Sequence, residues 1–222
     1  MRRAVPLALN SGYEDALIIR GRFSNPARRT AAVIALAVLV VGCVSTQDKI
    51  DAAKAVSRVF CERYEAIIAE RGTRIVRVPR DEAYTAMRAA LAGLGMKLED
   101  QNKKLGFFSV SAPAPLPLDP VEWDKVSDAD LPLLRGIAEP HIGWLTTHFL
   151  HFEPSGVQVV ITATVIEVPE GSSISVTVRL REVKPPPSGF PRRECLSPTV
   201  VRAGLDKIWA AFDHELPGAS AS

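Results

Sequence analysis

The sequence predicts an α+β fold: an antiparallel sheet of about five to six strands, with helices packed on one face and an N-terminal helix before it. Residues 157–168 and 174–183 alternate apolar and polar side chains on either side of a Glu-Gly-Ser turn, which is typical of a hairpin with one buried face. Residues 82–94 and the segment after Ser197-Pro198 carry apolar residues at helical spacing. These two helices are expected to cover the buried face.

Composition places the chain among ordinary globular proteins. It has 222 residues, of which 47% are hydrophobic and 23% charged, which excludes a wholly disordered chain. The net charge of +2 comes from the N-terminus, because residues 1–42 hold six Arg and two acidic residues. The rest of the chain has 21 basic and 23 acidic residues, so we expect no nucleic-acid partner.

A short apolar run near the N-terminus indicates export. Residues 31–41 are all apolar and follow the pair Arg28-Arg29. Eleven residues are about half the length that a helix needs to cross a bilayer, but they fit the apolar region of a signal peptide. The alternative is a buried core helix, which the absence of any polar face disfavours.

The run ends in Val40-Val41-Gly42-Cys43, which resembles the lipobox of bacterial lipoproteins. The resemblance implies that Cys43 is acylated and becomes the first residue of the mature protein, anchored to a membrane by its acyl chains. Val44 follows Cys43 where an Asp would suggest retention in the inner membrane, so the expected location is the periplasmic face of the outer membrane.

These signals divide the chain into four parts. Residues 1–42 are a cytoplasmic overhang and signal peptide, 43–72 the anchor and N-terminal helix, and 73–216 the α+β domain; 217–222 are a disordered tail. Within 43–72, the helix is expected from Gln47 to Arg71, where an apolar stripe ends before Gly72.

Further elements are read along the domain from its pattern. Strands are expected at 73–78, 96–101 and 105–111, and a helix at 82–94 with Asp81 as its cap and Gly95 as its stop; Gly106 would mark a bulge. Six prolines in 112–143 predict an extended loop, with one short helix at 128–135. The aromatic and β-branched residues of 144–152 predict another strand.

Residues 82–111 resemble the C-terminal domains of a lipoprotein component of the outer-membrane β-barrel assembly machinery and related helix-grip lipoprotein domains. The resemblance is carried by Leu91, Leu94-Gly95-Met96, Glu99-Asp100 and Leu105-Gly106-Phe107-Phe108. It implies a helix-grip-like fold over residues 73–214. It also implies an envelope protein as partner.

The chain has three cysteines. If Cys43 is acylated, Cys61 and Cys195 remain as an even pair in an oxidising compartment, where a disulfide between them is expected. The bond would join the N-terminal helix to the segment before the last helix. The alternative is two separate buried thiols.

No catalytic or metal-binding pattern stands out in the sequence. His148 and His151 are three residues apart, which places them on opposite faces of the expected strand and argues against a shared metal. No nucleophile elbow or zinc-protease motif is present, so we expect no cofactor and no enzyme. The arginines at 71, 74, 77 and 80 would touch anionic groups or protect an edge strand. Trp123, Trp144 and the Pro-rich loop are candidates for a contact surface.

Three functions remain open from the sequence. The first is a non-enzymatic lipoprotein that serves as a structural, assembly or adaptor component of the envelope, which predicts a filled core and an exposed apolar patch. The second is a small-ligand or lipid-binding domain with an apolar cavity between the sheet and the last helix. The third is an enzyme, which needs a cleft with perturbed titratable groups.

Overall fold

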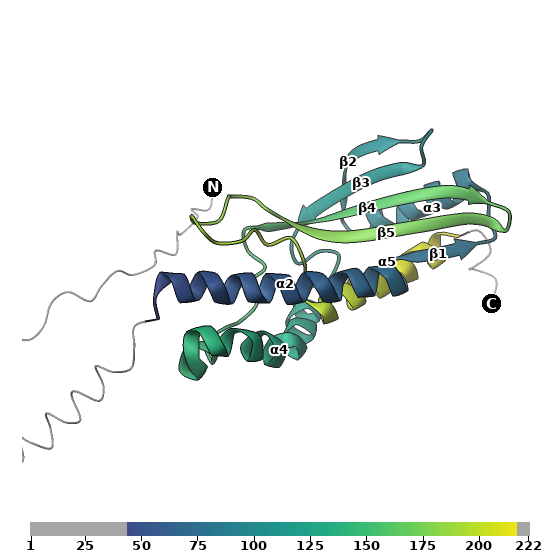
Figure 1. The fold of residues 1–222 in the computed structure, drawn as a ribbon. Coiled ribbons are helices and arrows are strands. Elements are labelled where there is room, and N and C mark those ends of the chain that lie inside the picture. Colours follow the sequence, from purple (N-terminus) through teal and green to yellow (C-terminus); the bar gives the residue numbers. More distant parts are fainter. Residues whose placement is uncertain (1–43, 217–222) are drawn as a thin grey trace, which may run out of the picture. The chain divides into compact units, whose positions relative to one another are not determined.

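A computed structural model describes residues 44–216. These residues form an antiparallel sheet of five strands and four helices, which confirms the α+β class (Figure 1). The strands lie in the order β1-β5-β4-β3-β2. The elements in chain order are α2 (Thr46–Arg71), β1 (Thr73–Val76), α3 (Arg80–Gly93), β2 (Lys97–Asn102), β3 (Phe107–Pro113), α4 (Pro120–Thr147), β4 (Val157–Val168), β5 (Gly171–Glu182) and α5 (Pro198–Glu215).

The predicted hairpin forms the centre of the sheet. β4 and β5 pair from Val157↔Glu182 to Val168↔Gly171, with Ile161 opposite Val178. Their apolar side chains lie on one face and are buried, while the alternate Thr, Ser and Arg side chains lie on the other face. One face of the sheet is therefore covered and the other is exposed to solvent, as the alternation predicts.

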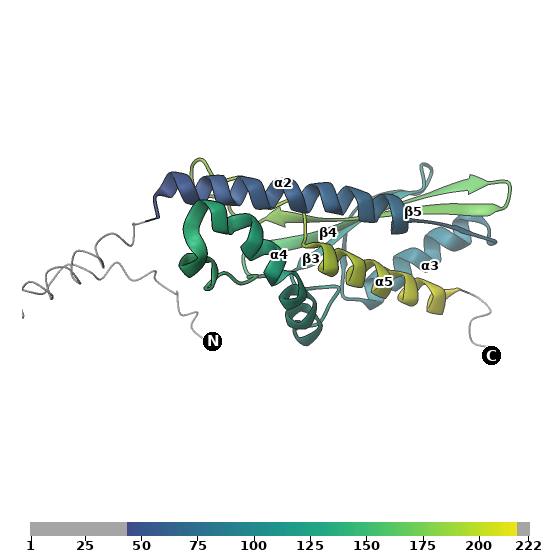
Figure 2. The same ribbon diagram turned by 60° about the horizontal axis from the view of Figure 1, so that its bottom comes forward.

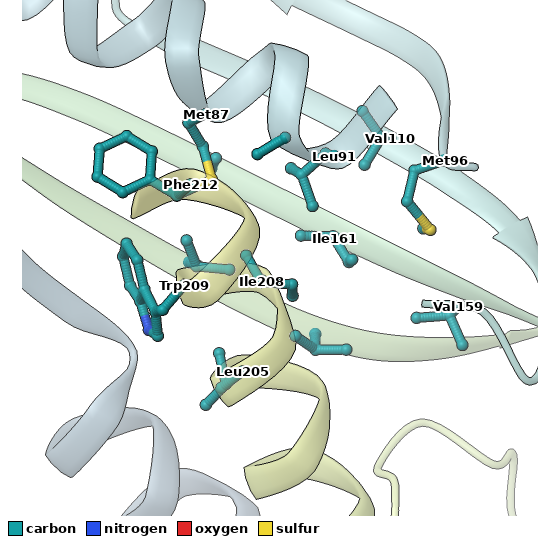
Figure 3. Packing of buried hydrophobic residues seen from close by; sticks show 14 of the residues in the cluster. Met87, Leu91, Met96, Val110, Val159, Ile161, Leu205, Ile208, Trp209 and Phe212 are labelled. Atoms are coloured by element: carbon teal, nitrogen blue, oxygen red, sulfur yellow. The ribbon is translucent and has the colours of Figure 1, made fainter. Parts of the chain in front are cut away.

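Helices α3 and α5 cover the buried face, and together with the sheet they enclose the main core (Figure 3). The residues expected on α5, Val201, Leu205, Ile208 and Phe212, are all fully buried. Met87 and Leu91 of α3 meet them above Ile161 of β4.

Helix α2 runs alongside β5, on the edge where β1 pairs with only residues 172–175 of that strand (Figures 1 and 2). Its C-cap, Gly72, leads directly into β1, and the Gly72 carbonyl accepts a hydrogen bond from the amide of Val176 in β5. Tyr64 of α2 is fully buried, and the guanidinium of Arg179 stacks on its ring 4.9 Å from the centroid. The helix thus shields β5 where no strand pairs with it.

Two segments contradict the sequence prediction. Residues 112–143 were expected to form an extended loop. Instead, β3 ends at Pro113, and most of α4 follows from Pro120. Residues 144–152, expected as a strand, hold the end of α4 and an irregular segment. Proline starts α4 at its first turn, and Pro132 and Pro140 are accommodated inside it, so the proline count misled the prediction.

Three local expectations need smaller corrections. Pro79, not Asp81, occupies the N-cap position of α3, with no side-chain cap bond. The bulge in β2 lies between Leu98 and Asp100, whereas Gly106 lies in the turn before β3 with φ 71°. Gly95 ends α3 as expected, with φ 81°.

Candidate functional site

The main feature outside the core is an apolar groove of about 940 Å³. It lies between α2, α4 and the segment 184–197, and the start of β4 and the end of β5 close it. Most of the side chains that line it are aliphatic, aromatic or proline. By contrast, the space between the sheet and α5, where the sequence placed a ligand cavity, holds a void of only about 10 Å³. That placement of the cavity is wrong.

The first wall of the groove is the N-terminal half of α2. A capping box begins this helix, in which Ser45 and Asp48 exchange hydrogen bonds at 3.0 and 3.1 Å. The bond from the Ser45 hydroxyl lowers the pKa of Asp48. The helix then presents small side chains to the groove, Ala52 and Ala53 among them, and they leave open space.

The second wall is α4, which presents Leu134, Ala138 and Ile142 to the groove. Its N-terminus is a capping box of Asp119 and Glu122, with reciprocal bonds of 2.9 and 2.8 Å. Asp119, Glu122 and Lys207 of α5 form one polar cluster, in which Lys207 pairs with Glu122.

A buried carboxylate joins α4 to α5. Asp130 accepts hydrogen bonds from the amide and the hydroxyl of Thr199, at 2.7 and 2.8 Å. Ser197 occupies the N-cap position of α5 and Pro198 follows at the first turn, but the Ser197 side chain makes no cap bond. Asp130 provides the cap from another helix instead. It therefore fixes the wall of the groove to the core.

The third wall is the proline-rich segment after β5. Pro185, Pro186, Pro187 and Phe190 line the groove, and no strand forms here. The segment returns to the sheet where the amide of Leu180 donates to the carbonyl of Glu194. Proline lacks an amide donor and cannot continue the ladder, so the wall stays irregular.

Cys61 of α2 and Cys195 at the end of this segment form a disulfide bond, as predicted, with sulfurs 2.09 Å apart. The bond links two walls of the groove at its base. Next to it, the rings of Phe60 and Phe152 stack with centroids 6.0 Å apart, and both line the groove.

Seven charged side chains line the groove, four basic and three acidic, and Glu182 among them is largely buried, with 9% of its side chain exposed and its Oε2 without a hydrogen-bond partner among the described residues. Arg193 pairs with Glu182 at 3.0 Å, and Glu153 accepts the amide of Ser155, which lowers the pKa of Glu153. Three cations of the lining are exposed and form no ion pair within residues 44–216: Lys49, Lys184 and Arg192. The groove thus combines a mainly apolar lining with four basic and three acidic side chains.

Trp123 lies where the groove meets the core. It lines both the groove and the small void under α5, and it is 5% exposed. Its indole N–H has no hydrogen-bond partner among the described residues. A buried donor without a partner is uncommon and costs free energy.

The other residues singled out in the sequence are scattered. Cys43 lies outside the described residues. His148 caps the end of α4 and His151 lies in the irregular segment beyond it. Within residues 44–216, no cluster of His, Cys, Asp and Glu has the make-up of a metal site, and no helix is long and apolar enough to cross a membrane.

Most of the arginine series is engaged within the domain. Arg71 pairs with Asp206 and Arg74 with Asp213, and Arg80 donates to backbone carbonyls of the turn before β3. β1 is an edge strand, which agrees with the protective role for these charges rather than a binding role.

Sequence patterns alone did not reveal the groove. Its lining comes from three separate stretches of the chain, residues 49–60, 123–157 and 180–197, and no single one carries a motif. The one available signal was Asp119-Pro120 followed by Glu122, a capping box that starts α4 inside the proline-rich region. No protein-family model matches the chain, and none of the curated proteins compared with it is significantly similar.

Proposed function

We propose that this chain is a non-enzymatic lipoprotein, held by acyl groups on Cys43 at the periplasmic face of the outer membrane. The apolar run 31–41 after Arg28-Arg29 and the lipobox-like Val40–Cys43 support the proposal. The folded domain starts immediately afterwards, with the capping box at Ser45. Such a domain needs no membrane-spanning helix, because acyl chains provide the attachment.

In this setting, we propose that the groove binds the hydrocarbon chain of an anionic amphiphile. The observation that carries the proposal is the groove itself, whose 940 Å³ lies in the range of ligand sites. Apolar chains gain free energy when they leave water for such a surface. Lys49, Lys184 and Arg192 line the groove and form no ion pair within residues 44–216, so they suit a carboxylate or phosphate headgroup.

A hydrocarbon chain fits the interior better than an extended peptide does. The nearest backbone edge is already in use, because Leu180 donates to Glu194. An extended peptide would leave its own amides and carbonyls without partners among prolines and alanines, at a cost in free energy. A hydrocarbon chain has no such groups.

The proposed anchor is tested by Cys43→Ser. Wild-type protein from native membranes should have an N-terminus at residue 43 that carries acyl mass, and the variant should be uncut and without acyl mass. Intact mass spectrometry and membrane fractionation measure both. A wild-type protein with an unmodified N-terminus upstream of Cys43 would contradict the anchor.

The groove is tested by a matched pair of substitutions on α2. Ala53→Phe fills the groove, whereas Ala66→Phe adds the same ring to an exposed position that does not line it. Native mass spectrometry of detergent-purified protein should show a non-covalent lipid on wild type and on Ala66→Phe, and at least tenfold less on Ala53→Phe. Equal lipid on both variants would place the ligand elsewhere, and no lipid on wild type would refute the binding role.

An assembly or adaptor role in the envelope is the second candidate. The observation that favours it is the open side of the groove between two long helices, a geometry that also receives an amphipathic helix of a partner protein. The same variants discriminate between the two roles. A defined envelope protein that is retained by wild type, without lipid, and lost from Ala53→Phe would favour the adaptor role.

A further inference from the structure

The end of α4 carries three exposed apolar side chains close together in the sequence, which we name the aromatic tip: Trp144, Leu145 and Phe149. They are 71%, 47% and 74% exposed. Other large exposed apolar residues are distributed singly over β1, β2, β4 and separate turns or helix ends. Three within six positions form a patch of the kind that contacts another apolar phase.

The backbone holds the aromatic tip outward. Gly143 has φ 75° and interrupts α4, which changes the direction of the chain just before Trp144. The last turn is then fixed by bonds from the Thr147 hydroxyl to the Trp144 carbonyl at 2.8 Å, and from Arg135 to the His148 carbonyl at 3.2 Å. These hydrogen bonds fix the backbone that carries the exposed side chains.

The aromatic tip lies at the end of the domain where α2 begins. A small apolar cluster joins Ala52 of α2 to Ala138 and Ile142 of α4, with Val44 and Leu150 packed against it. The start of α2 and the end of α4 lie at the same end of the domain in Figures 1 and 2. Val44 directly follows Cys43, so a group attached to Cys43 is within one residue of this cluster.

We propose that the aromatic tip inserts into the interfacial region of the bilayer that holds the anchor. Tryptophan and phenylalanine gain most at this depth, where an apolar ring is buried and the indole N–H stays near polar headgroups. The inference rests on the proposed anchor for the choice of bilayer. The inserted aromatic tip is a second point of contact with the bilayer, which fixes the orientation of the domain. The end of the groove that is lined by Lys49 and Ile142 then faces the lipid.

The tryptophans provide a direct test. The chain has three, of which Trp123 is 5% and Trp209 1% exposed, so Trp144 alone is exposed. The full acylated protein is reconstituted into phosphatidylcholine vesicles with and without brominated acyl chains. Bromine quenches indole emission at short range. Wild-type emission should be quenched, and Trp144→Phe, which keeps an apolar ring, should lose most of that quenching.

A second pair of variants tests the apolar side chains near Trp144, whose emission is the readout. Leu145→Ser with Phe149→Ser should reduce the quenching of Trp144 at least twofold. Val121→Ser is the matched control, since Val121 is 78% exposed at the opposite end of α4, and it should leave the quenching unchanged.

Several results would overturn the proposal. Equal quenching of wild type and Trp144→Phe would show that Trp144 stays outside the bilayer. Shielding of Trp144 from aqueous acrylamide without quenching by bromine would show that a protein covers it instead. Protein that fails to float with the vesicles would refute both the anchor and the insertion. Quenching that falls in Trp144→Phe but does not vanish supports the insertion of Trp144, and its remainder reports lipid beside Trp123.

Discussion

The core under the sheet and the groove beside it are made of similar apolar residues but are packed very differently. The core leaves a void of about 10 Å³ between the sheet and α5, whereas the groove leaves about 940 Å³ between α2, α4 and the proline-rich segment. In the core, large side chains from two helices meet a strand surface with a regular period, and Trp209, Phe212 and Met87 fill the space.

The groove differs because its walls combine small residues with proline. Ala52 and Ala138 pack in one cluster that joins α2 to α4, Ala53 adds little volume beside it, and Pro185–Pro187 cannot extend the sheet across the remaining space. Polar and covalent links hold the walls in place: Asp130 to Thr199, and Cys61 to Cys195. The opening is thus maintained by the same elements that complete the fold, which is what a preformed binding site requires.

The largest expected effect comes from removing the covalent link. Cys61→Ser with Cys195→Ser should lower the free energy of unfolding by up to about 4–5 kcal/mol, because the bond closes a long loop in the unfolded chain. Urea denaturation of oxidised and reduced protein, with the double variant, measures it. If all three have the same midpoint, the bond adds nothing to stability.

A matched pair of leucines compares the two regions directly. Leu205→Ala in the core should cost about 2–5 kcal/mol, because it leaves an enclosed cavity. Leu134→Ala should cost less, about 1–2 kcal/mol, since it only enlarges an existing opening. Thermal and urea unfolding measure both. An equal cost at the two sites would mean that the groove is closed and packed in solution.

The smallest effect should come from acid. Hydrogen bonds from Lys207 and from the Asp119 amide lower the pKa of Glu122, and the Glu122 amide lowers that of Asp119. Because the folded pKa values lie below the ordinary 4.5 and 3.8, their stabilisation is complete above about pH 4.5 and is lost as pH falls through the lowered values.

Acid should therefore loosen the first turn of α4 before it affects β4. Hydrogen-exchange protection of amides 121–126 is expected to fall between pH 5 and pH 2.5, while that of 161–165 persists. Glu122→Gln should flatten this pH dependence. If amides 121–126 and 161–165 lost protection in parallel, the first turn of α4 would not respond to acid separately from the sheet.

The sequence predicted the parts of the fold that are periodic. The β4–β5 hairpin and the buried stripe of α5 follow from spacing alone, and both burial patterns are confirmed. α4 was missed because Pro132 and Pro140 count as helix breakers locally, although packing against α2 and α5 supports the helix around them. The groove was missed because it depends on the distance between helices.

The disulfide between Cys61 and Cys195 also has a mechanical consequence. In the proposed lipoprotein, a pull on the acyl anchor at Cys43 would enter the domain through α2. Without a cross-link, such a load would strip that helix from the sheet edge one contact at a time. The bond passes the load to the segment before α5. The buried face of α5 packs in the main core. In that setting α2 and the body of the domain would bear force together.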